Sequence, residues 1–424
     1  MDLNMRYLIA PAFAVVLASG GLASPAFAQF AAVLAPSDVA LDNIVIHGKD
    51  PKDTVTLKRV EATGTNLTKD ELAKLFNSDT PTEAAAALAA KMKAAKLSIP
   101  EAVAGHPGST INLHGLVLTN VDAGKVGSFA VAGIDGAGKD GDEDFAIKSG
   151  PIEIKDVDLS TLMGGVKQGA ISASGFKIGS ISWTGFEVSF PDKDTPAASP
   201  GGNTIKLSMA SLTGQNTYDA GLPVKGSAKG EHLVIAFPKA SQAGEALAAF
   251  GYDNVDLGFT IATGYDKAHS TLTLDDYTIT AAKVGSLGAT GAIGGVDPAI
   301  FTGDQKAKMA SLLGANVTGL QLRYVDGGLF DKAVAFYATA QGQKPDEVKA
   351  GWSAMATQVL PLLLGGDPSS IKLAEAVSAF IANPKRLTVG AKAKGAPTKI
   401  SDLMTISEPQ AFLSKFDLSA EAGQ

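Results

Sequence analysis

Apolar and polar residues alternate along most of the chain, with the two-residue period of a β-strand that has one buried face. Clusters of Gly, Asn and Asp separate the alternating stretches and are typical of turns. The stretches expected to be strands are Ile44–His47, Val55–Ala62, Ile111–Val121, Phe129–Ile134, Ile152–Leu159, Ala170–Phe190, Ile205–Leu212, His232–Phe237, Val255–Gly264, Thr271–Thr280 and Leu387–Lys394. Their close spacing predicts an α+β, mainly β fold: a large curved antiparallel sheet or a part-closed barrel.

Helical periodicity is confined to two blocks. Two capping boxes, Thr68–Glu71 and Thr80–Glu83, begin helices that we expect to end near Asn77 and Lys96. The second block contains the expected helices Asp304–Leu313, Leu329–Gln341, Pro345–Leu364 and Pro368–Ala382, and a short helix near Pro409–Phe416 follows. Because their apolar residues recur every three or four positions, these helices need an apolar partner, and we expect an amphipathic helical block packed on the sheet.

A five-residue phrase occurs three times, at Lys125–Phe129, Lys177–Ile181 and Lys283–Leu287. It consists of Lys, then Val or Ile, then Gly, Ser and a large apolar residue. Strand parity places the apolar residue on one face of the sheet and the serine on the other. We interpret the phrase as part of a strand-and-turn unit that is used several times to build an extended sheet. The alternative is a strand-entry phrase favoured in an Ala- and Gly-rich chain.

The N-terminus has the pattern of a secretory signal peptide. Arg6 precedes an apolar run from Tyr7 to Ala18, and Ala26 and Ala28 supply the small residues of a cleavage site. The run is shorter than the roughly 20 apolar residues of a membrane-spanning helix. We therefore expect cleavage after Ala28, no transmembrane span in the remainder, and a periplasmic or secreted protein.

The rest of the chain divides into four expected parts. These are residues 29–110 with N-terminal strands and two helices, 111–300 with the repeated-strand body, 301–386 with the helical block, and 387–424 with a closing strand and a C-terminal helix.

Composition excludes several kinds of chemistry. The chain has no cysteine, which excludes a disulfide scaffold, a thiolate zinc site and a cysteine nucleophile. Its net charge of -7 argues against a nucleic-acid partner, which would need a basic face. No nucleophile elbow, phosphate-binding loop or HExxH motif is present. We predict a protein that is not an enzyme and has no cofactor, and keep a hydrolase with an unrecognised site as an alternative.

One loop carries a candidate calcium site. Asp140, Asp142 and Asp144 stand at alternate positions, as at the start of a calcium-binding loop. Phe145 occupies the sixth position, where such a loop has Gly, and Pro151 occupies the twelfth, where it has Glu. We therefore expect a solvated turn and no metal, with calcium as the alternative.

The second helical block suggests a ligand site. Incomplete closure between the helices and the apolar face of the sheet would leave an elongated cavity for an acyl chain. The residues expected to line it are Phe330, Phe336, Trp352, Met355 and Phe380. The alternative is a helical block that is fully packed against the sheet.

Three segments resemble β-rich envelope proteins of Gram-negative bacteria, the AsmA-like and YdgA-like groups. They are the repeated phrase, the strand Thr271–Tyr277 and the stretch Leu320–Phe330. The resemblance is one of sequence pattern, covers residues 110–395, and assigns no functional residue to this chain. It implies a periplasmic protein with a long curved sheet, in a setting of lipid handling and outer-membrane maintenance. Those groups keep an N-terminal anchor, whereas here we expect the N-terminus to be removed.

Two functions follow as hypotheses. The first is a non-catalytic envelope protein that binds a lipid or other apolar ligand between sheet and helices. The second is a structural or protein-interaction component of the envelope without a small-molecule ligand.

Overall fold

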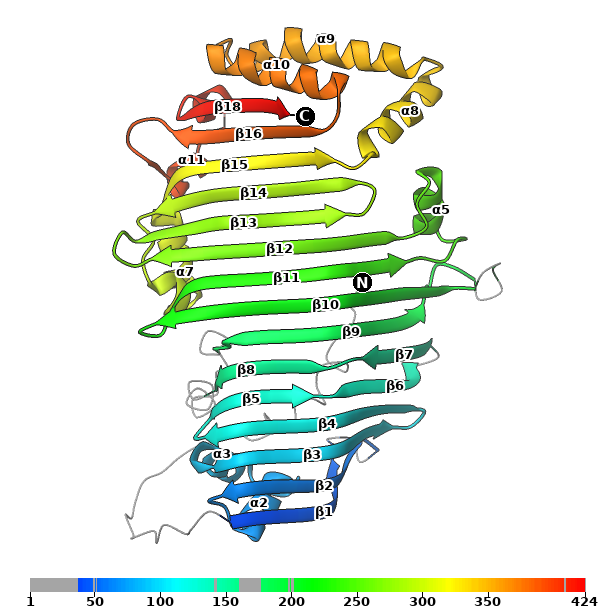
Figure 1. The fold of residues 1–424 in the computed structure, drawn as a ribbon, viewed down its shortest axis with the longest axis vertical. Helices are drawn as coiled ribbons and strands as arrows, with labels where there is room; N and C mark the ends of the chain where they lie inside the picture. The colour runs from blue at the N-terminus through cyan, green and yellow to red at the C-terminus, as the bar shows by residue number, and fades with distance from the viewer. Residues whose placement is uncertain are drawn as a thin grey trace. The chain divides into compact units, whose positions relative to one another are not determined.

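The computed structural model describes residues 37–423 except 49, 51, 141, 142, 160–176, 197, 198, 200, 201 and 408. The expected signal peptide and its cleavage site after Ala28 lie outside the described residues. Eighteen strands form a hydrogen-bonded antiparallel sheet, accompanied by several helices, so the predicted mainly β fold is confirmed (Figure 1). The chain divides into two compact units, and strand β10 (Thr204–Asp219) contributes to both.

The first unit comprises residues 1–193 and 204–213. Its other strands are β1 (Ser37–His47), β2 (Thr54–Thr65), β3 (Lys93–His106), β4 (Ser109–Asp122), β5 (Lys125–Val131), β6 (Gly133–Asp140), β7 (Glu143–Ser149), β8 (Ile152–Asp158) and β9 (Ser180–Pro191). Two helices, α2 (Lys69–Leu75) and α3 (Thr82–Lys91), connect β2 to β3. Apolar residues from β1–β4, the helices and their flanking turns form its largest core cluster, which includes Leu57, Val60 and Leu72.

The first predicted capping box is present at the start of α2. Glu71 N–H donates to Thr68 Oγ1 (3.2 Å), and Thr68 N–H donates to Glu71 Oε2 (3.0 Å). Lys91 Nζ donates to the same carboxylate (2.7 Å), and these bonds lower the pKa of Glu71 to about 2. The box therefore joins the first turn of α2 to the last turn of α3. The second helix begins at Thr82 behind Pro81 and ends at Lys91, earlier than expected, because β3 starts at Lys93.

The repeated phrase coincides with strand starts in all three places, at β5, β9 and β14 (Gly285–Gly294). A Cβ added at Gly127 would lie 3.0 Å from Asn120 Cβ, and one at Gly179 would lie 2.7 Å from Asp156 Cβ. Asn120 and Asp156 both have a positive φ in the left-handed region, 50° and 53°. In two of the three copies, the glycine thus makes room for a residue with positive φ on the neighbouring strand.

The second unit comprises residues 194–203 and 214–424. Its other strands are β11 (Leu222–Ala236), β12 (Val255–Asp266), β13 (Thr271–Ala281), β14, β15 (Asn316–Asp326), β16 (Arg386–Ala393), β17 (Thr398–Lys399) and β18 (Phe416–Gly423). Its helices are α5 (Gln242–Ala249), α6 (Ala299–Thr302), α7 (Gln305–Gly314), α8 (Leu329–Gln341), α9 (Pro345–Leu363), α10 (Pro368–Ala382), α11 (Ile400–Met404) and α12 (Pro409–Leu413). No helix among the described residues is long and apolar enough to cross a membrane.

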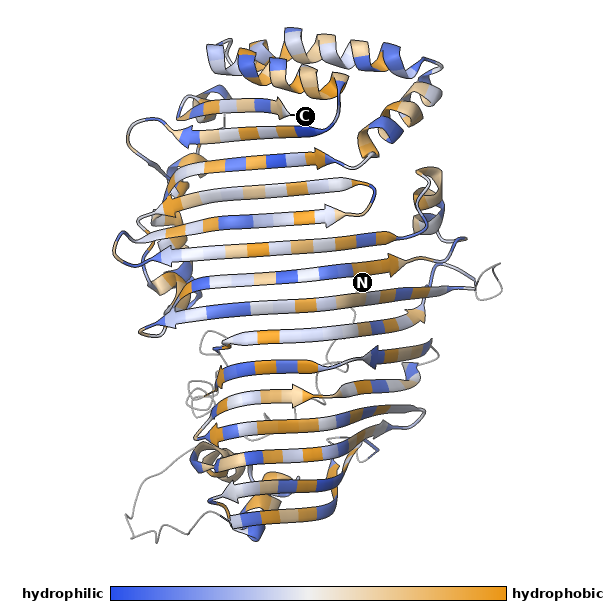
Figure 2. Cartoon of the chain, in the orientation of Figure 1, coloured by the Kyte–Doolittle hydropathy of each residue, from blue (hydrophilic) through white to orange (hydrophobic). Residues whose placement is uncertain are grey.

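The strand register gives this part of the sheet one apolar and one polar face. Directly paired residues across β12–β16 form the apolar row Phe259, Ile279, Leu287, Tyr324 and Leu387. One residue along each strand, the row reads Thr260, Thr278, Gly288, Arg323 and Thr388. Figure 2 shows the resulting alternation of hydrophobic and hydrophilic positions along these strands. The face parity expected for Ser286 and Leu287 is therefore observed.

Several strands occur where the sequence analysis expects none: β3 and β7 in the first unit, and β15, β17 and β18 in the second. β15 lies between helices of the predicted helical block, and β18 follows the expected C-terminal helix. Both pair with β16, so the helical block is interrupted by part of the sheet. The four long helices of the block agree with their expected ranges to within one residue.

Candidate functional site

An aromatic cluster joins the helical block to the sheet. Phe380 of α10 contacts Tyr324 of β15 and Phe330 of α8, with ring centroids 5.7 and 5.4 Å apart. Phe330 also contacts Trp352 of α9 (6.0 Å), edge to face as in the other two pairs. Three of the five predicted lining residues therefore come together, as a packed cluster. Tyr324 belongs both to this cluster and to the apolar row of the sheet.

The start of α8 is held by one carboxylate. Asp326 accepts hydrogen bonds from Gly328 N–H (2.8 Å), Phe330 N–H (3.0 Å) and the Tyr324 hydroxyl (2.9 Å). Burial, with the neighbouring Asp326 carboxylate, raises the pKa of Tyr324 to about 12. Gly328, the residue before the helix, has φ 112°, which favours glycine. Asp326 thus fixes the turn that places Phe330 against Phe380.

Most of the apolar face of β13–β15 lies outside the helical block. The exposed fractions are 36% for Ile279, 51% for Leu287, 45% for Leu320 and 43% for Leu322, and we call these four residues the apolar band. They lie on one face, because Ile279 pairs with Leu287, while Leu322 and Leu320 pair with Ala289 and Gly291 of β14.

Helices cover the same face on either side of the band. Towards the other end of the strands, Tyr265 is buried, and its ring contacts Phe301 of α6 at 4.9 Å. Towards β16 and β18, α10 packs on the sheet through Phe380. The band is therefore an uncovered stretch of a face whose neighbouring parts are buried.

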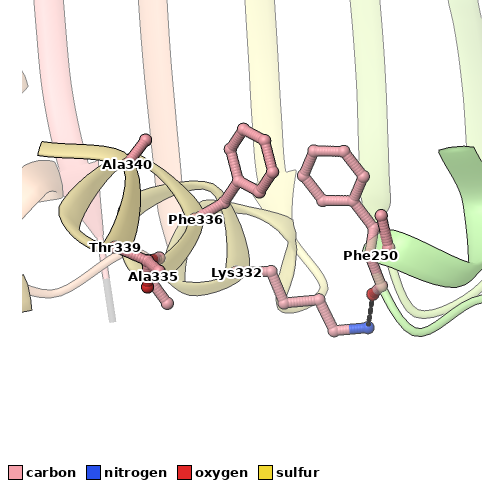
Figure 3. Close-up of a pocket in the computed structure, with 7 residues that line it drawn as sticks. Phe250, Lys332, Ala335, Phe336, Thr339 and Ala340 are labelled. Atoms are coloured by element: carbon pink, nitrogen blue, oxygen red, sulfur yellow. Dashed lines mark hydrogen bonds between the residues drawn. The ribbon is translucent and has the colours of Figure 1, made fainter.

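A hollow of about 480 Å³ lies between α5 and α8 (Figure 3). Phe336 of α8 faces Phe250, the residue after α5, with centroids 5.3 Å apart. Lys332 Nζ donates to the Phe250 carbonyl (2.9 Å) and lies 3.7 Å from the centroid of the Tyr252 ring. The remaining lining residues are Ala249, Ala335, Thr339 and Ala340. The predicted lining residue Phe336 thus borders a different space from the aromatic cluster.

The fifth predicted lining residue, Met355 of α9, is 61% exposed. Val348, seven residues earlier on the same side of the helix, is buried against α8. Met355 therefore continues the apolar stripe of α9 beyond the part that α8 covers, and it does not line the hollow.

The candidate calcium loop is only partly described. Asp142 lies outside the described residues, and Asp144 lies 3.8 Å from Lys139 Nζ. Asp140 ends β6, and its side chain is not among those described. Within the described ranges, no group of three or more His, Asp or Glu side chains is arranged to hold a metal ion. The calcium alternative stays a prediction.

Four of the five histidines contact an aspartate. The pairs are His106–Asp53 (2.6 Å), His114–Asp135 (2.5 Å), His232–Asp256 (3.1 Å) and His269–Asp266 (2.6 Å). The bond to Asp266 raises the pKa of His269, and bonds from Asn112 and His114 lower that of Asp135. The side chains of all four histidines are at least 43% exposed, and each histidine is engaged by its own carboxylate.

Comparison with known proteins gives a partial family match. A family model described only as an uncharacterised protein matches residues 278–423, about a third of the chain. No curated protein matches the chain. The matched segment begins within β13 and includes β14–β18, the helical block and all four residues of the apolar band. The resemblance to the AsmA-like and YdgA-like groups stays a prediction.

Sequence reasoning missed the apolar band and most of the hollow. Leu320 and Leu322 alternate with polar residues, and this alternation indicates a strand. The stretch lies between two predicted helices, and the sequence analysis expects no strand there. Phe250 and Lys332 are 82 residues apart, and no local pattern indicates that they meet.

Proposed function

We propose that this protein is a non-catalytic component of the cell envelope, periplasmic or secreted, that binds the apolar chain of a lipid or similar amphiphile. The observation that carries the proposal is the apolar band, four large aliphatic side chains that share one sheet face and are each at least 36% exposed. Soluble proteins rarely leave contiguous apolar surface bare unless it binds a partner or ligand. The expected signal peptide supports the envelope location.

The dimensions of the sheet suit a single acyl chain. Adjacent strands lie about 4.8 Å apart, so the apolar band, which crosses β13–β15, spans about 10 Å. That length accommodates a large part of one acyl chain. Tyr324, within the apolar row of the sheet, is packed by Phe380, so the aromatic cluster limits the band on the β16 side. Burying the band under a chain would remove its exposed apolar area from water.

Replacing Leu322 by Asp is expected to reduce apolar ligand binding at least tenfold, because a carboxylate in the band would have to be desolvated under the chain. The measurement is native mass spectrometry with lipid extraction, on protein purified without detergent from cells that express the whole chain. Wild-type protein should carry a bound mass in the lipid range.

Gln321→Asp is the matched control, because Gln321 neighbours Leu322 on β15, is exposed and lies on the polar face. It introduces the same residue into the same strand and should leave binding unchanged. A wild-type protein without bound lipid, whose organic extract is no richer than that of a control protein, would contradict the proposal. So would equal loss of ligand in both variants.

A second candidate, protein association in the envelope, is favoured by α9. Met355, Val359, Leu362 and Leu363 form a stripe on its outer face and are 44–74% exposed. Residues 350–366 carry no charge, so a second copy can meet this stripe without like-charge repulsion. An anionic membrane would instead favour a basic rim. The partner we propose is therefore a second copy, bound helix to helix about a two-fold axis.

Leu362→Asp is expected to abolish this self-association. Sedimentation velocity over a concentration series should show a reversible monomer–dimer equilibrium for wild-type protein and a monomer for the variant. Gln358→Asp, also exposed on α9, should behave as wild type. A wild-type monomer at every concentration would refute this candidate and leave the ligand-binding proposal untouched.

A further inference from the structure

The hollow between α5 and α8 contains a cation with unused bonding capacity. The Lys332 ammonium group has three N–H donors. One donates to the Phe250 carbonyl, and the ring of Tyr252 lies over the same group. These contacts leave a donor for a further acceptor, in a hollow that Phe250 and Phe336 also line (Figure 3).

The hollow is linked to the apolar band through two tyrosines. Tyr252, under Lys332, donates its hydroxyl to the Lys283 carbonyl (3.2 Å), in the turn between β13 and β14. Tyr252 also lies close enough to Tyr324 to contribute to the raised pKa of that phenol. Tyr324 in turn pairs with Leu287 of the band. Leu287 is four residues from Lys283, at most about 13 Å even for a fully extended chain, so one ligand can reach both places.

The two carboxylates at the start of α8, Asp326 and Asp331, already have partners. Asp326 accepts three hydrogen bonds, from two backbone N–H groups and the Tyr324 hydroxyl. Asp331 pairs with Lys349 of α9 (2.7 Å). Lys332 pairs with neither, and its described contacts are with a carbonyl and a ring, both uncharged. An incoming anion would therefore complete the coordination of Lys332.

We propose that the hollow binds the anionic head group of a single-chain amphiphile through Lys332, while its chain lies along the apolar band. This inference rests on the proposed function and adds the charge of the ligand to it. Phe250 and Phe336 contact the first carbons of the chain, and the head group remains at the open mouth of the hollow, where it keeps part of its hydration.

The test compares three ligands that share a twelve-carbon chain and differ in head-group charge. Laurate, 1-dodecanol and dodecyltrimethylammonium are titrated into the full chain below their aggregation limits, and affinity is measured by calorimetry. Wild-type protein should bind laurate about tenfold more tightly than dodecanol, a difference in affinity that corresponds to about one charge-assisted hydrogen bond. It should bind the ammonium ligand most weakly.

Lys332→Met keeps an unbranched side chain and removes the charge, so it should bring laurate and dodecanol to within about threefold of each other. Lys372→Met, at an exposed lysine of α10 that does not line the hollow, is the matched control and should keep the tenfold preference. A preference retained in Lys332→Met, or equal affinity for laurate and dodecanol in wild-type protein, overturns the inference and leaves the proposed function standing. Failure of all three ligands to bind wild-type protein overturns both.

Discussion

Asp326→Ala is expected to lower the free energy of unfolding of the second unit by about 3 kcal/mol. The substitution removes the acceptor of two backbone N–H groups and of the Tyr324 hydroxyl. A hydrogen bond to a charged group contributes about 1.5–3 kcal/mol, and losing a cap residue at a helix start costs about 0.5–2 kcal/mol. Part-buried donors left without partners account for most of the loss.

The measurement is urea unfolding followed by the fluorescence of Trp352, in a Trp183→Phe background because the chain has two tryptophans. Asp331→Ala is the control: it lies in the same helix and breaks an ion pair with Lys349 in which Asp331 is 63% exposed. Such surface pairs contribute about 0–1 kcal/mol. An equal effect of the two substitutions would show that Asp326 does not hold the start of α8.

Alkaline pH provides a second check on this carboxylate. The pKa of Tyr324 is raised from 10.0 to about 12, so the folded protein holds the phenol proton more strongly than the unfolded chain does. The resulting stabilisation is complete below about pH 10 and is lost as the pH rises towards 12. Because Asp326 is one cause of the shift, stability should depend less on pH across this range in Asp326→Ala than in wild-type protein.

The sequence predicted the elements well where one period persists over many residues. Helical spacing placed Phe330, Trp352 and Phe380 on inward faces, and they do meet. The same spacing put Met355 in the lining, because Met355 continues the apolar stripe of Val348 and Trp352, and periodicity alone does not say how far along a helix the covering partner extends.

What the sequence could not predict is which apolar surface stays bare. Strand parity correctly put Leu287 on the apolar face, together with its partners in register. Whether a helix covers that face depends on where α6 and α10 dock, which involves segments far apart in the chain. For the same reason the hollow was missed, since Phe250, which follows α5, and Phe336 of α8 are separated by four strands and two helices.

Leu72→Ala is expected to destabilise the first unit by about 3 kcal/mol. Leu72 is fully buried, in the cluster in which α2 and α3 pack on the sheet with Leu57 and Val60. Truncating a buried leucine loses its transfer free energy and leaves a cavity, at a cost of about 2–5 kcal/mol. Urea unfolding followed by Trp183, in a Trp352→Phe background, measures the change.

The control for this substitution is Lys74→Ala, in the same helix and exposed, where alanine is at least as good a helix former. It should change the stability of the unit by less than about 0.5 kcal/mol. If Leu72→Ala were equally mild, the two helices would not be essential to this core. The strands β1–β4 would then have to be stable with their apolar face largely uncovered, as the band is in the second unit. A large loss instead means that covering the face is what stabilises the sheet, and that leaving the band bare carries a cost which a bound apolar chain would offset.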